Sequence, residues 1–150
     1  MERLNIKARN HCLKIIEERL QNYLLDLKSL QQSAAEETKS SMGDKYETGR
    51  SMVQQEIDKV QGRVVELDKL IKVLQRLKSN SSDKVVMGSF VLTGQMNFFI
   101  SVSLGQLIFE DITFIAISPA TPLAQKMMGL GKGENVVLNK IEYKIKEVVN

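Results

Sequence analysis

Two carboxylates are the best candidates for chemistry in this chain, because Asp44 and Glu47 lie three positions apart in the segment Asp44-Lys45-Tyr46-Glu47. If a helix begins at Asp44, residues with this spacing share one face, and both carboxylates can reach a single hard cation such as Mg²⁺. Two carboxylates make an incomplete site, so further ligands must come from water, a substrate phosphate or another protein. A metal ion held by this pair would therefore have to be shared with water, a substrate phosphate or another protein.

The same spacing also has a purely structural interpretation. An acid followed three positions later by Glu, ahead of an apolar run, forms a capping box, in which each side chain accepts a hydrogen bond from the other residue's backbone N–H. The spacing of Asp44 and Glu47 by itself favours this cap. Glu36 and Glu37 allow the same two interpretations, and a solvated helix face is the default expectation for them.

Other kinds of catalytic site are poorly supported. The chain has one histidine, His11, and one cysteine, Cys12, which excludes a zinc ligand set and a His-dependent triad. No Walker or dinucleotide-binding glycine motif is present. The glycine-rich stretch 129–133 follows a predicted helix instead of opening one, so it predicts a loop. We expect His11 to be solvated and Cys12 to be a partly buried, unreactive thiol.

Two heptad patterns flank the acidic pair, and both alternate steps of three and four, as the seam of a coiled coil does. The first seam consists of Leu13, Ile16, Leu20, Tyr23, Leu27, Leu30 and Ala34, and the second of Val53, Ile57, Val60, Val64, Leu67, Ile71 and Leu74. Antiparallel pairing centres both seams near residue 42, where Gly43 can form the turn. The sequence thus predicts a hairpin, roughly 45 Å from Leu13 to the turn, with its tip near 42–47. Helix 1 is expected to begin late, because residues 2–10 have a weaker seam.

A polar break at residues 79–83 separates the hairpin from a segment of different periodicity, which predicts domains at 1–78 and 79–150. Branched and aromatic residues predict strands at 85–92, 97–104, 107–109, 113–118, 135–138 and 141–149. Asn139-Lys140 is a plausible two-residue turn between the last two. Thr121 can cap a short helix that runs from Pro122 to Met128. The predicted fold class is α+β, an N-terminal antiparallel coiled-coil hairpin followed by a small antiparallel sheet domain with one short helix.

Composition and charge narrow the remaining functional classes. The 150-residue chain has a net charge of +3. Counted by segment, only residues 36–50 have a net negative charge, with four acids against three bases. Basic arms that lead to an acidic tip differ from the concentrated cations of a simple DNA-binding face. The absence of a bilayer-spanning segment or a secretory leader predicts a cytoplasmic protein. Because both seams can be satisfied within one chain, we expect a monomer, although Met42 and Met52 could form a contact surface.

The order of these features resembles the bacterial Gre transcript-cleavage factors, which have a long helical hairpin, Gly-Asp-x-x-Glu at its tip and a small sheet domain. Two distant segments agree. Thr121 to Gly129 resembles the family's Ser-Pro-Leu segment and short helix. Gly129 to Val136 resembles its Gly-Lys-x-x-Gly-Asp-x-Val stretch, with Leu130 in place of the lysine and Glu134 in place of the aspartate. Residues 142–145 are similar to its last strand. The resemblance implies an FKBP-like sheet domain at the mouth of the RNA polymerase secondary channel, with the coiled coil inside the channel.

The resemblance also implies a role for the tip. Asp44 and Glu47 match the acids that help the polymerase hold a Mg²⁺ ion, not stably bound by the factor alone, and cleave the 3′ end of backtracked RNA. The protein would then not be an enzyme by itself, and its partners would be bacterial RNA polymerase and the nascent RNA. Cations along the hairpin could line the RNA path or form ordinary solvated surface; they include Lys7, Arg19, Arg63 and Lys72.

The tip departs from the family pattern after Glu47. The family continues with Asn, a further acid and an aromatic residue, whereas this chain reads Thr48-Gly49-Arg50-Ser51-Met52. A second hypothesis is therefore a channel regulator that does not stimulate cleavage. A third is an FKBP-like prolyl isomerase or a general interaction module, although the sheet domain lacks tryptophan and an evident proline pocket.

Overall fold

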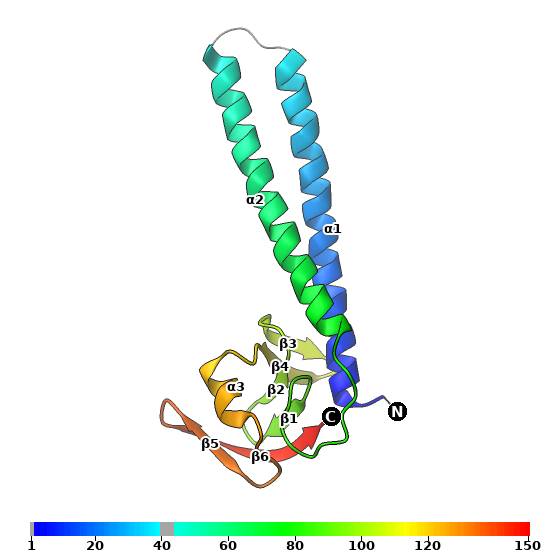
Figure 1. The fold of residues 1–150 in the computed structure, drawn as a ribbon, viewed down its shortest axis with the longest axis vertical. Coiled ribbons are helices and arrows are strands. Elements are labelled where there is room, and N and C mark those ends of the chain that lie inside the picture. The colour runs from blue at the N-terminus through cyan, green and yellow to red at the C-terminus, as the bar shows by residue number, and fades with distance from the viewer. Residues whose placement is uncertain (1, 40–43) are drawn as a thin grey trace. The chain divides into compact units, whose positions relative to one another are not determined.

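The computed structural model describes residues 2–39 and 44–150, and it describes side chains outside residues 37–48. Two long helices are followed by a sheet domain with one short helix (Figure 1). The elements are α1 (Leu4–Lys39), α2 (Asp44–Gln75), β1 (Phe90–Thr93), β2 (Asn97–Ile100), β3 (Gly105–Phe109), β4 (Ile112–Ile117), α3 (Pro122–Met127), β5 (Asn135–Leu138) and β6 (Ile141–Val149). This arrangement confirms the predicted α+β class, with a helical hairpin ahead of a sheet domain.

The described chain divides into two compact units that cut across the long helices. One unit is Ile15–Ile71, the hairpin unit, and the other combines Met1–Lys14 with Lys72–Asn150, the sheet unit. In the sheet unit, the Arg3 guanidinium donates to the backbone carbonyl of Asn150 over 2.6 Å. The first turns of α1 therefore belong structurally with the sheet.

The hairpin unit has the two seams that the heptads predict. Every predicted seam residue is buried or half-buried, and most residues between them are exposed. Ile57, Val60 and Leu67 of α2 are at most 8% exposed. Burial of such apolar stripes, at about 25 cal/mol per Å², provides most of the stability of paired helices. The hairpin is thus stabilised by the seam residues and not by helix propensity alone.

Helix α1 begins at Leu4, so the expectation of a late start was wrong. The weak heptad in this region has a physical reason, because the first turns of α1 pack on the sheet. Ala8 is 2% exposed, and Leu4 and Ala8 line a small crevice together with Phe90 and Phe114 of the sheet. A flat sheet selects small and apolar residues at a different spacing from a coiled-coil partner.

The six strands form one sheet in the order β3-β4-β2-β1-β6-β5. Four strand pairs are antiparallel as predicted, but β2 and β4 are parallel, so the sheet is mixed. The parallel pair arises because β4 inserts between β2 and β3. Since β3 runs opposite to β2, and β4 turns back from β3, two reversals restore the direction of β2.

The first strand is shorter than the predicted 85–92. Residues 85–89 form an irregular segment, in which the backbone N–H of Ser89 donates to the carbonyl of Val86 over 3.0 Å and Gly88 has φ +92°. A positive φ is incompatible with an extended strand and favours glycine. Val85 is nevertheless fully buried, so the apolar pattern correctly identified a core residue in a segment that is not a strand.

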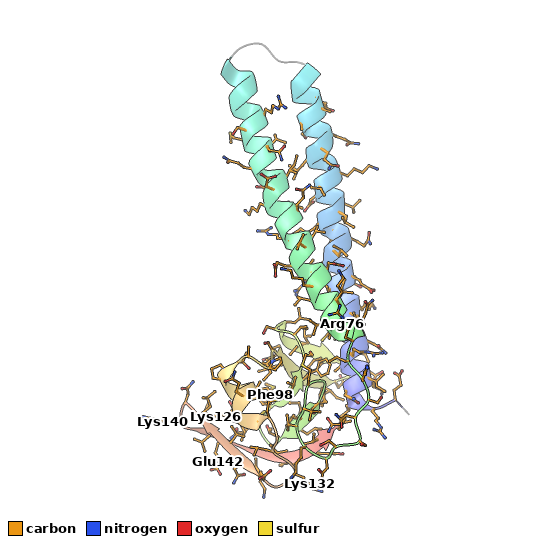
Figure 2. The ribbon with its side chains drawn as sticks, viewed as in Figure 1. Arg76, Phe98, Lys126, Lys132, Lys140 and Glu142 are labelled. Carbon is orange, nitrogen blue, oxygen red and sulfur yellow. The ribbon has the colours of Figure 1, made fainter. Side chains whose placement is uncertain are left out.

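Helix α3 and its cap agree with the sequence. Thr121 has extended backbone angles, and its hydroxyl accepts from the backbone N–H of Ala124 over 3.3 Å. Ala124 and Met127 are fully buried against one face of the sheet, in a cluster with Phe98 (Figure 2) and Ile145. The cap and the buried face together fix this short helix.

The opposite face of the sheet carries an aromatic cluster. Phe90 and Phe99 lie near Phe114, with ring centroids 5.4 and 6.4 Å away, respectively. Because successive residues of a strand point to opposite faces, Phe98 and Phe99 serve the two different cores. The sheet therefore has α3 on one face and the start of α1 on the other.

Gly62 offers a test of the hairpin's stability. It lies within α2, and a Cβ added there would meet no heavy atom within 4 Å. Gly62→Ala is expected to stabilise the protein by about 1 kcal/mol, because alanine removes the conformational freedom that glycine loses in a helix. Urea unfolding followed by circular dichroism measures the change. An unchanged or lower midpoint would show that formation of this part of α2 does not limit stability.

Candidate functional site

The predicted acidic pair lies in the first turn of α2, because this helix begins at Asp44. The condition for a shared helical face is therefore met for Asp44 and Glu47. Two acids at a helix N-terminus also interact favourably with the helix dipole. Their side chains lie outside the described residues, and the choice between metal ligands and helix cap stays a prediction. The same holds for Glu37 and for the turn at Met42 and Gly43.

The two helices that carry the tip are long. With 36 residues in α1 and 32 in α2, they extend about 54 and 48 Å, at about 1.5 Å per residue. Helix α2 continues through Gly49, a residue that weakens a helix. Toward the turn, Leu30, Ala34 and Val53 are half-buried. The apolar seam of the hairpin thus continues to the last turns of α1 and the first turns of α2, close in sequence to Asp44 and Glu47.

The cations along the helices have different surroundings. The Arg63 guanidinium carbon lies 5.5 Å from the centroid of the Tyr23 ring, which is a cation–π contact between the two helices of the hairpin unit. In the sheet unit, the Lys7 ammonium lies 3.3 Å from a carboxylate oxygen of Glu110. Arg19 and Lys72 are exposed. Lys7 and Arg63 therefore have intramolecular roles, which for them favours the structural interpretation over an RNA path.

His11 is not solvated as expected, and this prediction was wrong. The residue is half-buried. The centroid of its ring lies 5.1 Å from the ring centroid of Phe109 and 6.5 Å from that of Phe114. The sequence pattern missed this contact because the two phenylalanines lie about a hundred positions further along the chain. His11 is part of the aromatic cluster between α1 and the sheet.

Cys12 is fully buried, and desolvation by burial raises the pKa of its thiol from 9.0 to about 12. Because the thiolate is the reactive form, the native protein is expected to resist thiol reagents at pH 8 and to react only on unfolding. A time course with a chromogenic disulfide, with and without denaturant, measures this. Rapid labelling of the native protein would show that the start of α1 opens readily.

The raised pKa of Cys12 also makes the free energy of unfolding depend on pH. The folded state disfavours the thiolate, so the contribution of the buried thiol to this free energy is complete below pH 9. It is lost as pH rises from 9 toward 12. Relative to Cys12→Ala, the wild-type protein is expected to lose about 1.4 kcal/mol between neutral pH and pH 10. Urea unfolding of both proteins at the two pH values isolates the difference from the titration of lysines. Equal losses in the two proteins would contradict it.

The glycine-rich stretch forms a loop, as predicted. Gly129 and Gly133 have φ values of +82° and +92°, and the backbone N–H of Gly131 donates to a carboxylate oxygen of Glu134 over 2.6 Å. A phosphate cradle requires free backbone N–H groups. Here an acid of the same loop already occupies one of them, so the loop has a structural role.

Within the part of the chain that the structure describes, no three or more histidine, cysteine, aspartate or glutamate side chains are grouped to hold a metal ion. No helix among these residues is long and apolar enough to cross a membrane. The metal role predicted for Asp44 and Glu47, whose side chains lie outside the described residues, stays a prediction.

Comparisons with known proteins found no matching family model and no matching curated protein. The chain is similar to a solved structure of GreA factor homolog 1 (Gfh1) of Thermus thermophilus, with 21% identity over 95% of this chain and 92% of that chain and a TM-score of 0.35. A structure of the transcription factor Gfh1 is similar with 20% identity over 95% of this chain and 91% of that chain and a TM-score of 0.34. The likeness spans nearly the whole of both chains, at low identity and a low TM-score.

Proposed function

We propose that this protein is a Gre-like transcription elongation factor that binds the secondary channel of bacterial RNA polymerase and stimulates cleavage of backtracked RNA. The observation that carries the proposal is the start of α2 at Asp44, which places Asp44 and Glu47 in one helical turn at the end of a long hairpin. The two C-terminal segments that resemble the Gre factors, 121–129 and 129–136, support it independently.

The donor set fits the chemistry. Carboxylate oxygens at i and i+3 are hard ligands of the kind that Mg²⁺ prefers, and a pair leaves positions for water and phosphate oxygens. An ion held jointly with the polymerase would neutralise charge on the attacked phosphate and orient a water. The part of this chain is to bring Asp44 and Glu47 to the polymerase, on two helices whose seam holds them together. Hydrolysis itself would belong to the polymerase.

A channel regulator without cleavage activity is the second candidate. It is favoured by the sequence after Glu47, where Thr48-Gly49-Arg50-Ser51-Met52 lacks the Asn, the further acid and the aromatic residue of the Gre factors. Fewer acids at the tip leave fewer ligands for the shared ion, while the hairpin could still occupy the channel. The two candidates differ only in what the tip does after binding.

An RNA cleavage assay separates them. The protein is mixed with backtracked elongation complexes that contain 5′-labelled RNA and Mg²⁺ but no nucleotides, and the RNA length is followed beside an Asp44→Ala/Glu47→Ala double variant. Shortening of the RNA by the wild-type protein, but not by the double variant, supports cleavage. Binding to the polymerase without shortening assigns the regulator function, and absence of binding rejects both.

A further inference from the structure

A small cavity in the sheet unit combines positive charge with unpaired buried atoms. Its water-accessible volume is about 30 Å³. The chain segments that meet there are the start of α1, residues 77–79 just after α2, and the irregular segment before β1. The polar residues that line it are Asn5, Arg9, Lys78 and Ser79, and the rest of the wall includes Leu77 and Gly88. The start of α1 thus meets a segment about seventy positions further along the chain.

The lining of this cavity is positive. Arg9 and Lys78 both line it, and no aspartate or glutamate does. Among the described residues, neither cation has a carboxylate partner. Lys78 is exposed, but Arg9 is half-buried, and a partly desolvated charge without a counter-charge is costly. The arrangement favours binding of an anion.

Two of the three buried side-chain atoms without a hydrogen-bond partner in the described structure belong to residues of this cavity. They are the Nε of Arg9 and the Oδ1 of Asn5. A buried donor that lacks an acceptor is destabilising, because no hydrogen bond compensates for its loss of water. The Nε of Arg9 therefore requires an acceptor from outside the chain. A half-turn of the Asn5 amide replaces its oxygen by an N–H₂ donor, which would suit the same ligand.

The size and wall of the cavity limit the ligand. Its volume of about 30 Å³ admits about two water-sized groups, at 10–15 Å³ for each. Gly88 has φ +92°, a backbone conformation that favours glycine, so this part of the wall carries no side chain. A tetrahedral oxyanion could place two oxygens inside while the others stay in solvent. Guanidinium groups bind phosphate oxygens in this paired manner.

We propose that the cavity between Arg9, Lys78 and Ser79 is a binding site for a phosphate-type oxyanion, either free phosphate or the phosphoryl group of a nucleotide. The Arg9 guanidinium and the Lys78 ammonium supply the charge, and Ser79 and Asn5 supply neutral donors. The site is independent of Asp44 and Glu47, and it does not require the proposed function.

Nuclear magnetic resonance of the full chain tests the site. Sodium phosphate is titrated against sodium chloride at constant ionic strength, while the Nε–Hε signal of Arg9 and the backbone signals of Ser79 and Gly88 are followed. We expect saturable shifts at these positions. Arg9→Gln and Lys78→Gln are each expected to weaken binding about tenfold, by loss of a charge-assisted hydrogen bond. The matched control is Arg76→Gln, because Arg76 (Figure 2) is exposed, near the end of α2, and does not line the cavity.

A parallel titration with adenosine monophosphate distinguishes the two sources of the phosphate group. Equal affinity assigns recognition to the oxyanion alone, and tighter binding assigns the site to a nucleotide. Shifts that stay linear in phosphate, or that are the same in both variants and the wild-type protein, would overturn the proposal and leave a water-filled cavity. Because Lys78 is exposed, Lys78→Gln keeps the test valid even if Arg9→Gln fails to fold.

Discussion

Replacing both tip acids by their amides, Asp44→Asn with Glu47→Gln, is expected to slow RNA cleavage about 100-fold while binding to the polymerase stays unchanged. Asparagine caps a helix as well as aspartate does, and glutamine can replace glutamate in a capping box. The amides therefore preserve the structural role that competes with metal binding. They remove only the negative charge that a shared Mg²⁺ requires, and gel analysis of labelled RNA measures the effect.

The matched control for this double variant is Glu18→Gln with Asp26→Asn. Both acids are exposed on α1, so the control changes the net charge of the hairpin by the same amount away from the tip. We expect its cleavage rate to stay within about twofold of wild type, because exposed charges interact weakly through water. Full activity of the Asp44/Glu47 amide variant would assign the pair to the helix cap and leave the proposed cleavage mechanism without ligands.

Phe114→Ala is expected to lower the free energy of unfolding by about 3–5 kcal/mol. Its side chain is 1% exposed, and its ring contacts those of Phe90, Phe99 and His11 at centroid distances between 5.4 and 6.5 Å. Truncation leaves a cavity where the sheet meets the start of α1, and the rigid strands around it cannot close the space. Chemical denaturation followed by circular dichroism measures the loss.

The control for Phe114 lies on the adjacent strand. Ile108 of β3 is 64% exposed, so Ile108→Ala removes a large apolar side chain from the same sheet at a cost of about 0.5 kcal/mol or less. If both variants lost the same stability, the effect would reflect strand propensity and not the aromatic cluster. If Phe114→Ala were nearly neutral, the start of α1 would not be packed on the sheet.

Local pattern predicted several elements closely. Strands β5 and β6 begin and end at the predicted residues, because each is bounded by polar residues. Asn139 and Lys140 both have positive φ, as a tight two-residue hairpin turn requires. The Thr121 cap and both helical seams likewise involve residues close in sequence. These features depend on neighbours within a few positions, and such neighbours can be recognised in the sequence.

The errors concern residues whose partners are distant. His11 was expected in solvent but packs on Phe109, and α1 starts early because its first turns cover the sheet. The parallel pairing of β2 and β4 depends on where β4 inserts, which hydrophobic alternation does not specify. No sequence pattern indicated that Arg9 and Lys78 line one cavity. These residues are 69 positions apart and become neighbours only when α1, α2 and the sheet pack together.

The sequence by itself determined the periodic parts of this protein, namely the two seams, the short capped helix and the Asp44–Glu47 pair at the start of α2. Helical and strand periodicity reflect local backbone geometry, so they can be read without knowing the fold. Only the tertiary structure decided what covers each face of the sheet and which charges meet in the Arg9–Lys78 cavity. Such contacts depend on the burial of surfaces contributed by distant segments, and no single stretch of sequence encodes them.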